Sequence, residues 1–314
     1  MFDAHYDRER FRFFHSELLE SGLFNTYNNQ TIIPKTAVFI GKNFNVFIDT
    51  SDGVNEDLKI QEYCGRIKRI IELSNGSPFL FFKSAYSTKW SRNIKDIAEL
   101  HNGKVIPFFK WSFNSNFYSV LYGKKIEYLE KYKKIDKEYD VGIFFDDKLY
   151  NYPKPSESDN TISWGDHKKF NIPGHSCNTG YYEINSRNDI ISKLKKSRFK
   201  VLHSSLPYEE YIKASFKCKV IINPPGIGEY TSRMVDQTYL GNCIVLRKNS
   251  YDNCLSWKSY LPEIDFENKR WESNLQDIIN NLELHQRKSF EYYEKFWTSD
   301  VIVSYIKNKI GEYL

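Results

Sequence analysis

Short apolar runs alternate with amphipathic segments along the chain. The apolar runs are bounded by Gly, Pro, Asn or Asp, which predicts buried strands, and the longer 3.6-residue patterns between them predict helices. Strands that are apolar throughout and separated by helices indicate parallel sheets covered on both faces, so the predicted fold class is α/β. The predicted strands are Ala37–Ile40, Asn45–Ile48, Phe79–Phe82, Val105–Phe109, Val141–Phe145, Lys200–Leu202, Val220–Ile222 and Cys243–Leu246. The predicted helices are Arg8–Ser21, Leu58–Leu73, Ser91–Asn102, Lys124–Lys134, Arg187–Lys196, Tyr208–Ser215, Tyr230–Leu240 and Leu275–Trp297.

The length of 314 residues favours two domains. The charged segment KKIDKEYD reads as a hinge, and it places the boundary near Asp136. We therefore expect an N-terminal domain over 1–136 and a C-terminal domain over 137–296, with a last helix over 297–314 that returns to complete the first domain. The polar, proline-containing stretch 146–181 follows a predicted strand and reads as a long functional loop.

Composition excludes several classes of protein. Hydrophobic residues make up 40% and aromatic residues 17% of the chain, which excludes whole-chain disorder and collagen-like structure. The net charge of +5 is small and dispersed, so no nucleic-acid partner is expected. Five cysteines without a CxxC pair argue against a zinc site or a disulfide framework and fit a reducing compartment. The N-terminus lacks the apolar core of a signal peptide, and no apolar run could span a bilayer. We therefore expect a soluble, cytoplasmic protein that is a monomer or a weak dimer.

The most informative segment is 217–246, with the sequence KCKVIINPPGIGEYTSRMVDQTYLGNCIVL. It predicts a strand, a glycine-containing turn, a helix and a second strand. Gly226 and Gly228 permit a tight turn and a close approach of the backbone to a ligand. The free N–H groups at the start of the helix favour an anion, and Arg233 has the planar fork that binds phosphate. Glu229 can cap the helix or accept hydrogen bonds from ribose hydroxyls, and Asp236 shares a helical face with Arg233.

These residues together predict a nucleotide-diphosphate site. The alternative is a plain turn before a capped helix, which does not account for the two glycines, Thr231, Arg233 and Asp236 occurring together. The segment is not a Walker A loop, because no GKS or GKT follows it. It also lacks the third glycine of a dinucleotide-binding fingerprint.

Residues 208–246 resemble the C-terminal half of exostosin-like glycosyltransferases (glycosyltransferase family 47). That family's pattern is a helix ending in Ser, a strand, a glycine-rich turn, Ser/Thr-x-Arg with an acid three residues later, then Gly and a strand. The elements that match are Ser215, Val220–Ile222, Gly226, Gly228, Ser232, Arg233, Asp236, Gly241 and Cys243–Leu246. The family usually has Glu at the position of Asp236. The chain also looks like compact exostosin-like enzymes of large DNA viruses, some of which resemble xylosyltransferases.

The resemblance implies the GT-B architecture, in which two Rossmann-like domains face each other across a cleft. It implies that a nucleotide sugar binds the C-terminal domain, that the acceptor binds the N-terminal domain, that no metal is required, and that the reaction inverts. The pair Asp146-Asp147 lacks the spacing of a metal-binding DxD. Hydroxyls after the strand Lys200–Leu202 can read the base, although Ser205 can instead cap the next helix. The predicted donor-binding residues are Ser204, Ser205, Gly226, Gly228, Glu229, Tyr230, Thr231, Ser232, Arg233 and Asp236.

An inverting transferase also needs a group that takes the proton from the acceptor hydroxyl. Asp49 and Asp52 follow a predicted strand in the N-terminal half, and we predict that one of them is this base, with Arg233 assisting catalysis. The alternative is that either aspartate caps a turn, because Asp-Gly is a common turn pair. Predicted acceptor-binding residues, which could equally lie in solvated loops, are Lys83, Tyr86, Trp111 and His175.

The sequence therefore predicts a metal-independent glycosyltransferase that needs no cofactor. It would move a monosaccharide, with xylose as one candidate, from a UDP-sugar to a hydroxyl of a glycan or glycoprotein. The alternative is a non-catalytic nucleotide- or carbohydrate-binding protein with the same fold. A sugar-phosphate epimerase would need a pair of acid and base groups near the diphosphate, and the sequence offers no convincing pair.

Overall fold

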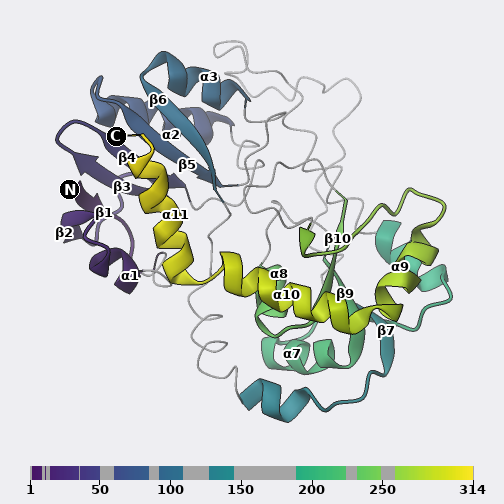
Figure 1. Cartoon of the computed structure of the whole chain (residues 1–314). Helices are drawn as coiled ribbons and strands as arrows, with labels where there is room; N and C mark the ends of the chain where they lie inside the picture. Colours follow the sequence, from purple (N-terminus) through teal and green to yellow (C-terminus); the bar gives the residue numbers. More distant parts are fainter. Residues whose placement is uncertain are drawn as a thin grey trace.

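A computed structural model describes residues 2–8, 11, 15–34, 36–49, 60–84, 92–108, 127–144, 189–223, 232–248 and 259–313. The predicted α/β class is confirmed, because the described residues form two largely parallel sheets with helices packed on their faces (Figure 1). The predicted boundary at Asp136 falls between the last strand of the first sheet and the first strand of the second. The division into domains itself stays a prediction.

The first sheet has the strand order β2-β1-β3-β4-β5-β6. Its strands are β1 (Phe2–His5), β2 (Phe24–Asn28), β3 (Thr36–Gly41), β4 (Asn45–Asp49), β5 (Phe79–Ser84) and β6 (Gly103–Phe108). The expectation of purely parallel strands is wrong at β3, which pairs antiparallel with both β1 and β4. Only residues 42–44 separate β3 from β4. That connection forms a hairpin, because a parallel crossover needs a dozen or more residues.

Successive side chains along the strands of the first sheet point to opposite faces of the sheet, and both faces are apolar. Phe47 and Phe81 face the helices α2 (Ile60–Ser74) and α3 (Arg92–Leu100). Their neighbours Ile48 and Phe82 belong to the core on the opposite face. That opposite face is covered by α1 (His15–Glu20) and α11 (Ser299–Gly311). Burial on both faces explains why these strands read as continuous apolar runs.

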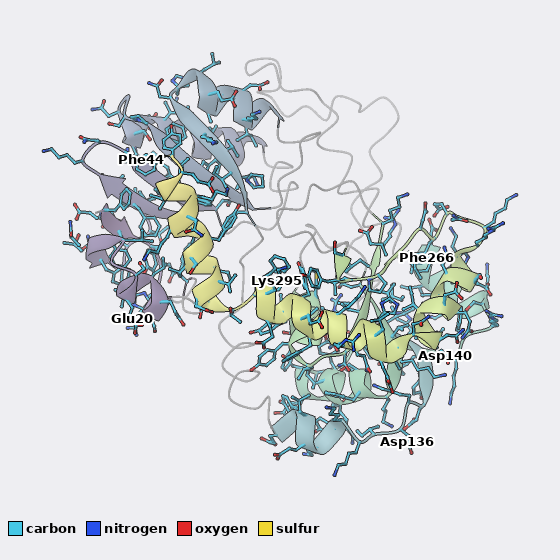
Figure 2. The ribbon with its side chains drawn as sticks, in the orientation of Figure 1. Glu20, Phe44, Asp136, Asp140, Phe266 and Lys295 are labelled. Carbon is cyan, nitrogen blue, oxygen red and sulfur yellow. The ribbon has the colours of Figure 1, made fainter. Side chains whose placement is uncertain are left out.

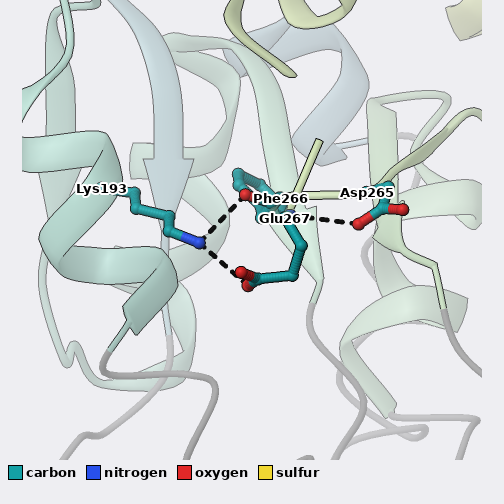
Figure 3. A network of polar contacts seen from close by, with 4 residues as sticks. All are labelled: Lys193, Asp265, Phe266 and Glu267. Atoms are coloured by element: carbon teal, nitrogen blue, oxygen red, sulfur yellow. Dashed lines mark hydrogen bonds and ion pairs between the residues drawn. The ribbon is translucent and has the colours of Figure 1, made fainter. Parts of the chain in front are cut away.

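The second sheet is parallel throughout, with the order β11-β10-β9-β7-β8. Its strands are β7 (Tyr139–Ile143), β8 (Val201–His203), β9 (Cys218–Asn223), β10 (Cys243–Arg247) and β11 (Glu263–Ile264). The helices on one face are α7 (Tyr208–Phe216), α8 (Ser232–Tyr239) and α10 (Leu282–Phe296), and those on the other are residues 189–196 and α9 (Trp271–Asn280). Lys193 ties this second layer together, because its ammonium donates to the carbonyl of Phe266 and pairs with Glu267 just after β11 (Figure 3).

The predicted helix Leu275–Trp297 is two helices in the structure. Helix α9 ends at Asn280 and α10 begins at Leu282, with Asn281 between them. The Asn281 side chain donates a hydrogen bond of 2.8 Å to the carbonyl of Asp277. A short polar side chain that bonds the preceding turn competes with the helical hydrogen bonds, and this explains the break.

Helix α11 follows α10 after Trp297 and runs along the first sheet (Figure 1). The ring of Tyr305 lies against Phe108 and Phe82, and its hydroxyl donates a 2.9 Å hydrogen bond to the carbonyl of Pro107. Near the end of the chain, the ring of Tyr313 stacks on Phe44, which Figure 2 labels beside the end of α11. The last helix therefore covers strands at the opposite end of the sequence.

Candidate functional site

The order of strands in the second sheet identifies where a ligand would bind. From β7 the chain crosses to β8 on one side, whereas β9, β10 and β11 follow on the other side of β7. The winding therefore reverses between β7 and β9. In open α/β sheets, ligands bind outside the carboxyl ends of the strands at such a switch point. The segments that leave these two strand ends are 145–188 and 224–231, which lie outside the described residues.

These two segments contain the long loop and the glycine turn that the sequence singles out. Of the predicted donor-binding residues, Gly226, Gly228, Glu229, Tyr230 and Thr231 lie outside the described residues, as does the pair Asp146-Asp147. Asn223 ends β9 and is buried, and Ser232 begins α8. The predicted glycine turn therefore falls between the end of β9 at the switch point and the start of α8, and its own structure stays a prediction.

The amino end of helix α8 lies at the switch point, and buried side chains of the helix anchor it to the core. Met234, Val235 and Tyr239 are buried. The helix ends at Tyr239, and Gly241 just beyond it has a φ of 69°, which suits glycine. The N–H groups of Gly241 and Asn242 return to the carbonyls of Thr238 and Gln237 at 3.0 and 2.9 Å, which is the Schellman pattern.

Buried amide and hydroxyl groups hold α8 against α7. The Gln237 side-chain N–H donates to the hydroxyl of Tyr211, and its oxygen accepts a 2.7 Å hydrogen bond from Asn242. Asn242 also donates to the hydroxyl of Ser215 at 3.3 Å, and that hydroxyl donates to the carbonyl of Ile212 at 2.7 Å. Ser215 is the serine that the family pattern places at the end of this helix. In this chain it belongs to the network that orients α8, and with it Arg233.

Two charged side chains lie on the first turns of α8. Arg233 is the second residue of the helix and is half-buried, whereas Asp236 is only 3% exposed. Burial raises the pKa of Asp236 to about 8, and the nearby charge of Arg233 lowers it only in part. The phenols of Tyr208 and Tyr211 on α7 have raised pKa values, first because they are buried and then because of the charge of Asp236.

The serines after β8 lie at the same edge of the sheet. The N–H of Ser204 donates a 3.1 Å hydrogen bond to the carbonyl of Ile143 on β7, and Ser205 is exposed. The alternative role of Ser205 as a helix cap is wrong, because the residue that precedes α7 is Pro207, and no side-chain cap is present there. Their predicted contact with the base stays a prediction.

In the first sheet, Asp49 ends β4 and Lys83 lies beside it on β5. The ammonium and carboxylate are 3.1 Å apart, and neither side chain is exposed. The sequence predicted Asp49 as one of two candidate bases and Lys83 as an acceptor contact, and both roles stay predictions. The ion pair argues against Asp49 as the base, because an adjacent ammonium stabilises the charged carboxylate and makes it less ready to accept a proton. Asp52, Tyr86, Trp111 and His175 lie outside the described residues.

The same edge of the first sheet holds a polar pair that sequence reasoning missed. Tyr6, directly after β1, shares a 2.8 Å hydrogen bond with Nδ1 of His15, and both side chains are buried. Burial lowers the pKa of His15, and the charge of Arg8 lowers it further. Strand β1 runs in the same direction as β4, because both are antiparallel to β3. The pair therefore lies at the edge where β4 ends with Asp49.

Within the described residues, no group of three His, Cys, Asp or Glu side chains could hold a metal ion. Over the same part of the chain, none of the helices is both long enough and apolar enough to cross a membrane.

Comparison with known proteins adds little to this geometry. No family model and no curated protein matches the chain. Among solved structures, it is similar to the sucrose-phosphate synthase of Thermosynechococcus elongatus, at 10% identity, over 98% of this chain and 72% of that one, with a TM-score of 0.43. A TM-score this low supports no conclusion about fold or activity. The α/β class is established by the two sheets described above, and the resemblance to exostosin-like enzymes stays a prediction.

The buried ion pair of Asp49 and Lys83 generates a stability prediction. Lys83→Met leaves a buried carboxylate without its cation, which we expect to lower the free energy of unfolding by about 3–5 kcal/mol. Replacing both residues, by Asp49→Leu with Lys83→Met, removes both charges and should recover most of that loss. Urea unfolding of the three proteins measures this. A loss below about 1 kcal/mol for Lys83→Met, the size typical of exposed pairs, would contradict it.

Proposed function

We propose that the protein is a metal-independent, inverting glycosyltransferase. Its donor would be a UDP-sugar, with xylose as one candidate, and its acceptor a hydroxyl of a glycan or glycoprotein. The second sheet would bind the nucleotide, and the first sheet would bind the acceptor and supply the base. The finer parts of this proposal, namely the nucleotide, the sugar and inversion, rest on the resemblance of residues 208–246 to exostosin-like enzymes.

One observation carries the proposal. Strand β9 ends with Asn223 at the switch point of the second sheet, and α8 with Arg233 begins at Ser232, so that only the segment predicted to form the glycine turn separates them. A helix amino end offers free N–H groups and a positive dipole, and an arginine adds a fork that matches phosphate oxygens. These groups would bind the diphosphate and stabilise the charge that develops on it as the glycosidic bond breaks.

The acceptor side would use the edge where β4 ends. Of the two predicted bases, Asp52 is the better candidate, because Asp49 lies in a buried ion pair with Lys83. In this proposal Asp52 takes the proton of the acceptor hydroxyl as that oxygen attacks the anomeric carbon, and UDP leaves from the opposite face. The Asp49–Lys83 pair would hold the end of β4 from which the segment carrying Asp52 departs.

The same ion pair is the observation that favours the alternative, a binding protein without a working base. Such a protein would bind UDP or a glycan but would not break the bond between sugar and nucleotide. A transferase hydrolyses its donor slowly in the absence of acceptor, whereas a binding protein does not. Incubation with UDP-sugars and detection of free UDP therefore separates the two.

Replacement of Arg233 tests the donor site. Wild-type protein should bind UDP, and Arg233→Ala should weaken binding by about 10- to 100-fold, the effect of losing a charged hydrogen bond worth about 1.5–3 kcal/mol. Arg233→Lys should recover only part of this, because an ammonium lacks the fork. Calorimetric titration with UDP measures each affinity, and Arg287→Ala, at an exposed arginine of α10, is the matched control. Unchanged affinity in Arg233→Ala would contradict the assignment of the donor site. If the wild-type protein binds no nucleoside diphosphate, the proposed function is wrong.

Chelation tests metal independence. Transfer activity should persist in excess EDTA, because the helix amino end and Arg233 neutralise the diphosphate in place of a cation. The measurement is the initial rate of UDP release with and without EDTA. Complete loss of activity that Mn²⁺ restores would contradict the proposal and would make Asp146-Asp147 the first candidates for ligands.

Substitution of Asp52 tests the base. Asp52→Asn keeps the shape of the side chain but cannot accept a proton, so turnover should fall by about 10²–10⁴-fold while UDP affinity hardly changes. Asp96→Asn, at an exposed position of α3, is the control for the same chemical change. Near-normal turnover in Asp52→Asn would exclude it as the base and would direct attention to Asp49 and to the Tyr6–His15 pair.

A further inference from the structure

The amino ends of three neighbouring strands of the second sheet meet at one edge. Strands β8, β7 and β9 are adjacent and parallel, so all three begin at the edge opposite to the switch point. The N–H of Asp140, which Figure 2 labels, donates to the carbonyl of Lys200 at 2.9 Å. The N–H of Tyr139 donates to the carbonyl of Lys217 at 3.0 Å. The segments that lead into these strands therefore lie side by side.

Basic residues concentrate in these segments. Residues 131–140, 195–200 and 213–219 together hold eleven Lys or Arg and three Asp or Glu, a surplus of eight positive charges. The whole chain has a net charge of only +5, so the rest of the chain is net acidic. The charge that is dispersed along the sequence is therefore gathered by the fold at one edge of the second sheet.

Two of the three acids at this edge are already paired. The carboxylate of Glu138 lies 2.6 Å from the ammonium of Lys217, and that of Asp140 lies 2.8 Å from Lys219. Six of the other cations are exposed and directly precede β7 or β8 in the chain. We call them the amino-edge surface, and they are Lys133, Lys134, Lys195, Lys196, Arg198 and Lys200. Within the described residues, none of the six forms an ion pair.

The dipole of the preceding helix explains only part of this pattern. Cations are favourable in the last turn of a helix, and Lys195 and Lys196 end the helix 189–196. Arg198 and Lys200 lie beyond that turn, where the dipole has fallen off. The ammonium of Lys200 lies 4.9 Å from the centre of the Tyr139 ring, yet its side chain stays exposed. An anionic partner accounts for the cations that the dipole leaves unexplained.

We propose that the amino-edge surface binds a lipid bilayer that contains acidic phospholipids. Each Lys or Arg close to such a bilayer strengthens binding by about fivefold. Five of the six cations are lysines, whose compact charges on flexible stems suit a fluid array of headgroups better than a fixed fork does. Because the surface lies at the amino ends of the strands, docking leaves the switch point at their carboxyl ends open.

A nucleic acid is the other large anion to consider, and the surface suits it less. Single strands stack their bases on exposed aromatic rings, and base edges are commonly read by arginine. The three segments contain four aromatic residues. Tyr132, Phe199 and Phe216 are buried, and Tyr139 is half-buried. The surface therefore supplies positive charge without the groups that recognise bases.

Sedimentation with lipid vesicles tests the proposal on the whole protein. At about 0.15 M salt, the protein should sediment with vesicles of equimolar phosphatidylcholine and phosphatidylserine, and not with vesicles of phosphatidylcholine alone. At about 1 M salt it should stay in solution, because the Debye length falls from about 8 Å to about 3 Å.

A fourfold variant locates the binding surface. Replacing four cations of the amino-edge surface should lower the affinity for the acidic vesicles by about 100-fold or more. The substitutions, made in one protein, are Lys195→Gln, Lys196→Gln, Arg198→Gln and Lys200→Gln. A control variant with the same change in net charge should retain most of the wild-type affinity. Its substitutions, all at exposed positions elsewhere, are Lys42→Gln, Lys68→Gln, Lys104→Gln and Arg270→Gln.

Three results would overturn the proposal. The first is a wild-type protein that does not sediment with the acidic vesicles, and this measurement decides without any variant. The second is an equal loss in both variants, which would mean that only the net charge matters. The third is binding to duplex DNA without binding to vesicles, which would assign the surface to a nucleic acid. None of these results bears on the nucleotide site, because the eight substituted residues lie away from the switch point.

Discussion

Trp297, between the last two helices, is part of one apolar core that extends to both sheets. That core contains Phe82 of the first sheet, Ile221 of the second, and Trp297, which is 1% exposed. Helix α10 ends before Trp297 on the second sheet, and α11 begins after it on the first. Since protein interiors are close-packed and transmit strain, a change in packing at Trp297 would alter the packing against both sheets.

Two buried acids, one at the end of β4 and one on α8, each have a basic residue near them in the structure. In the first sheet, Asp49 has an ammonium 3.1 Å away and forms an ion pair. In the second, Asp236 has an arginine one helical turn before it, yet burial outweighs that charge. The acid of the first sheet is therefore held in an ion pair, whereas burial raises the pKa of the acid on α8.

The strands that are buried on both faces were predictable, because their residues are apolar throughout. Strand β2 was not, since Phe24–Asn28 is polar and partly exposed at the edge of its sheet. Strand β11 has two residues, which is too short for a periodic signal. The helix that carries Arg233 could be predicted because its pattern is local, whereas the glycine turn before it lies outside the described residues and stays a prediction. The pairing of Asp49 with Lys83 depends on strand order, and that of Tyr6 with His15 depends on how α1 packs against the end of β1. No local pattern contains either.

The position of α11 has a consequence for how the chain folds during synthesis. The hydroxyl of Ser299, at the start of α11, contacts the carboxylate of Glu17, 282 positions earlier in the sequence. Contacts this far apart raise the contact order and slow folding. The first sheet leaves the ribosome early, but Phe82 and Phe108 on its apolar face gain their contact with Tyr305 only once α11 has emerged. Until then that face is a surface to which a chaperone, or another nascent chain, can bind.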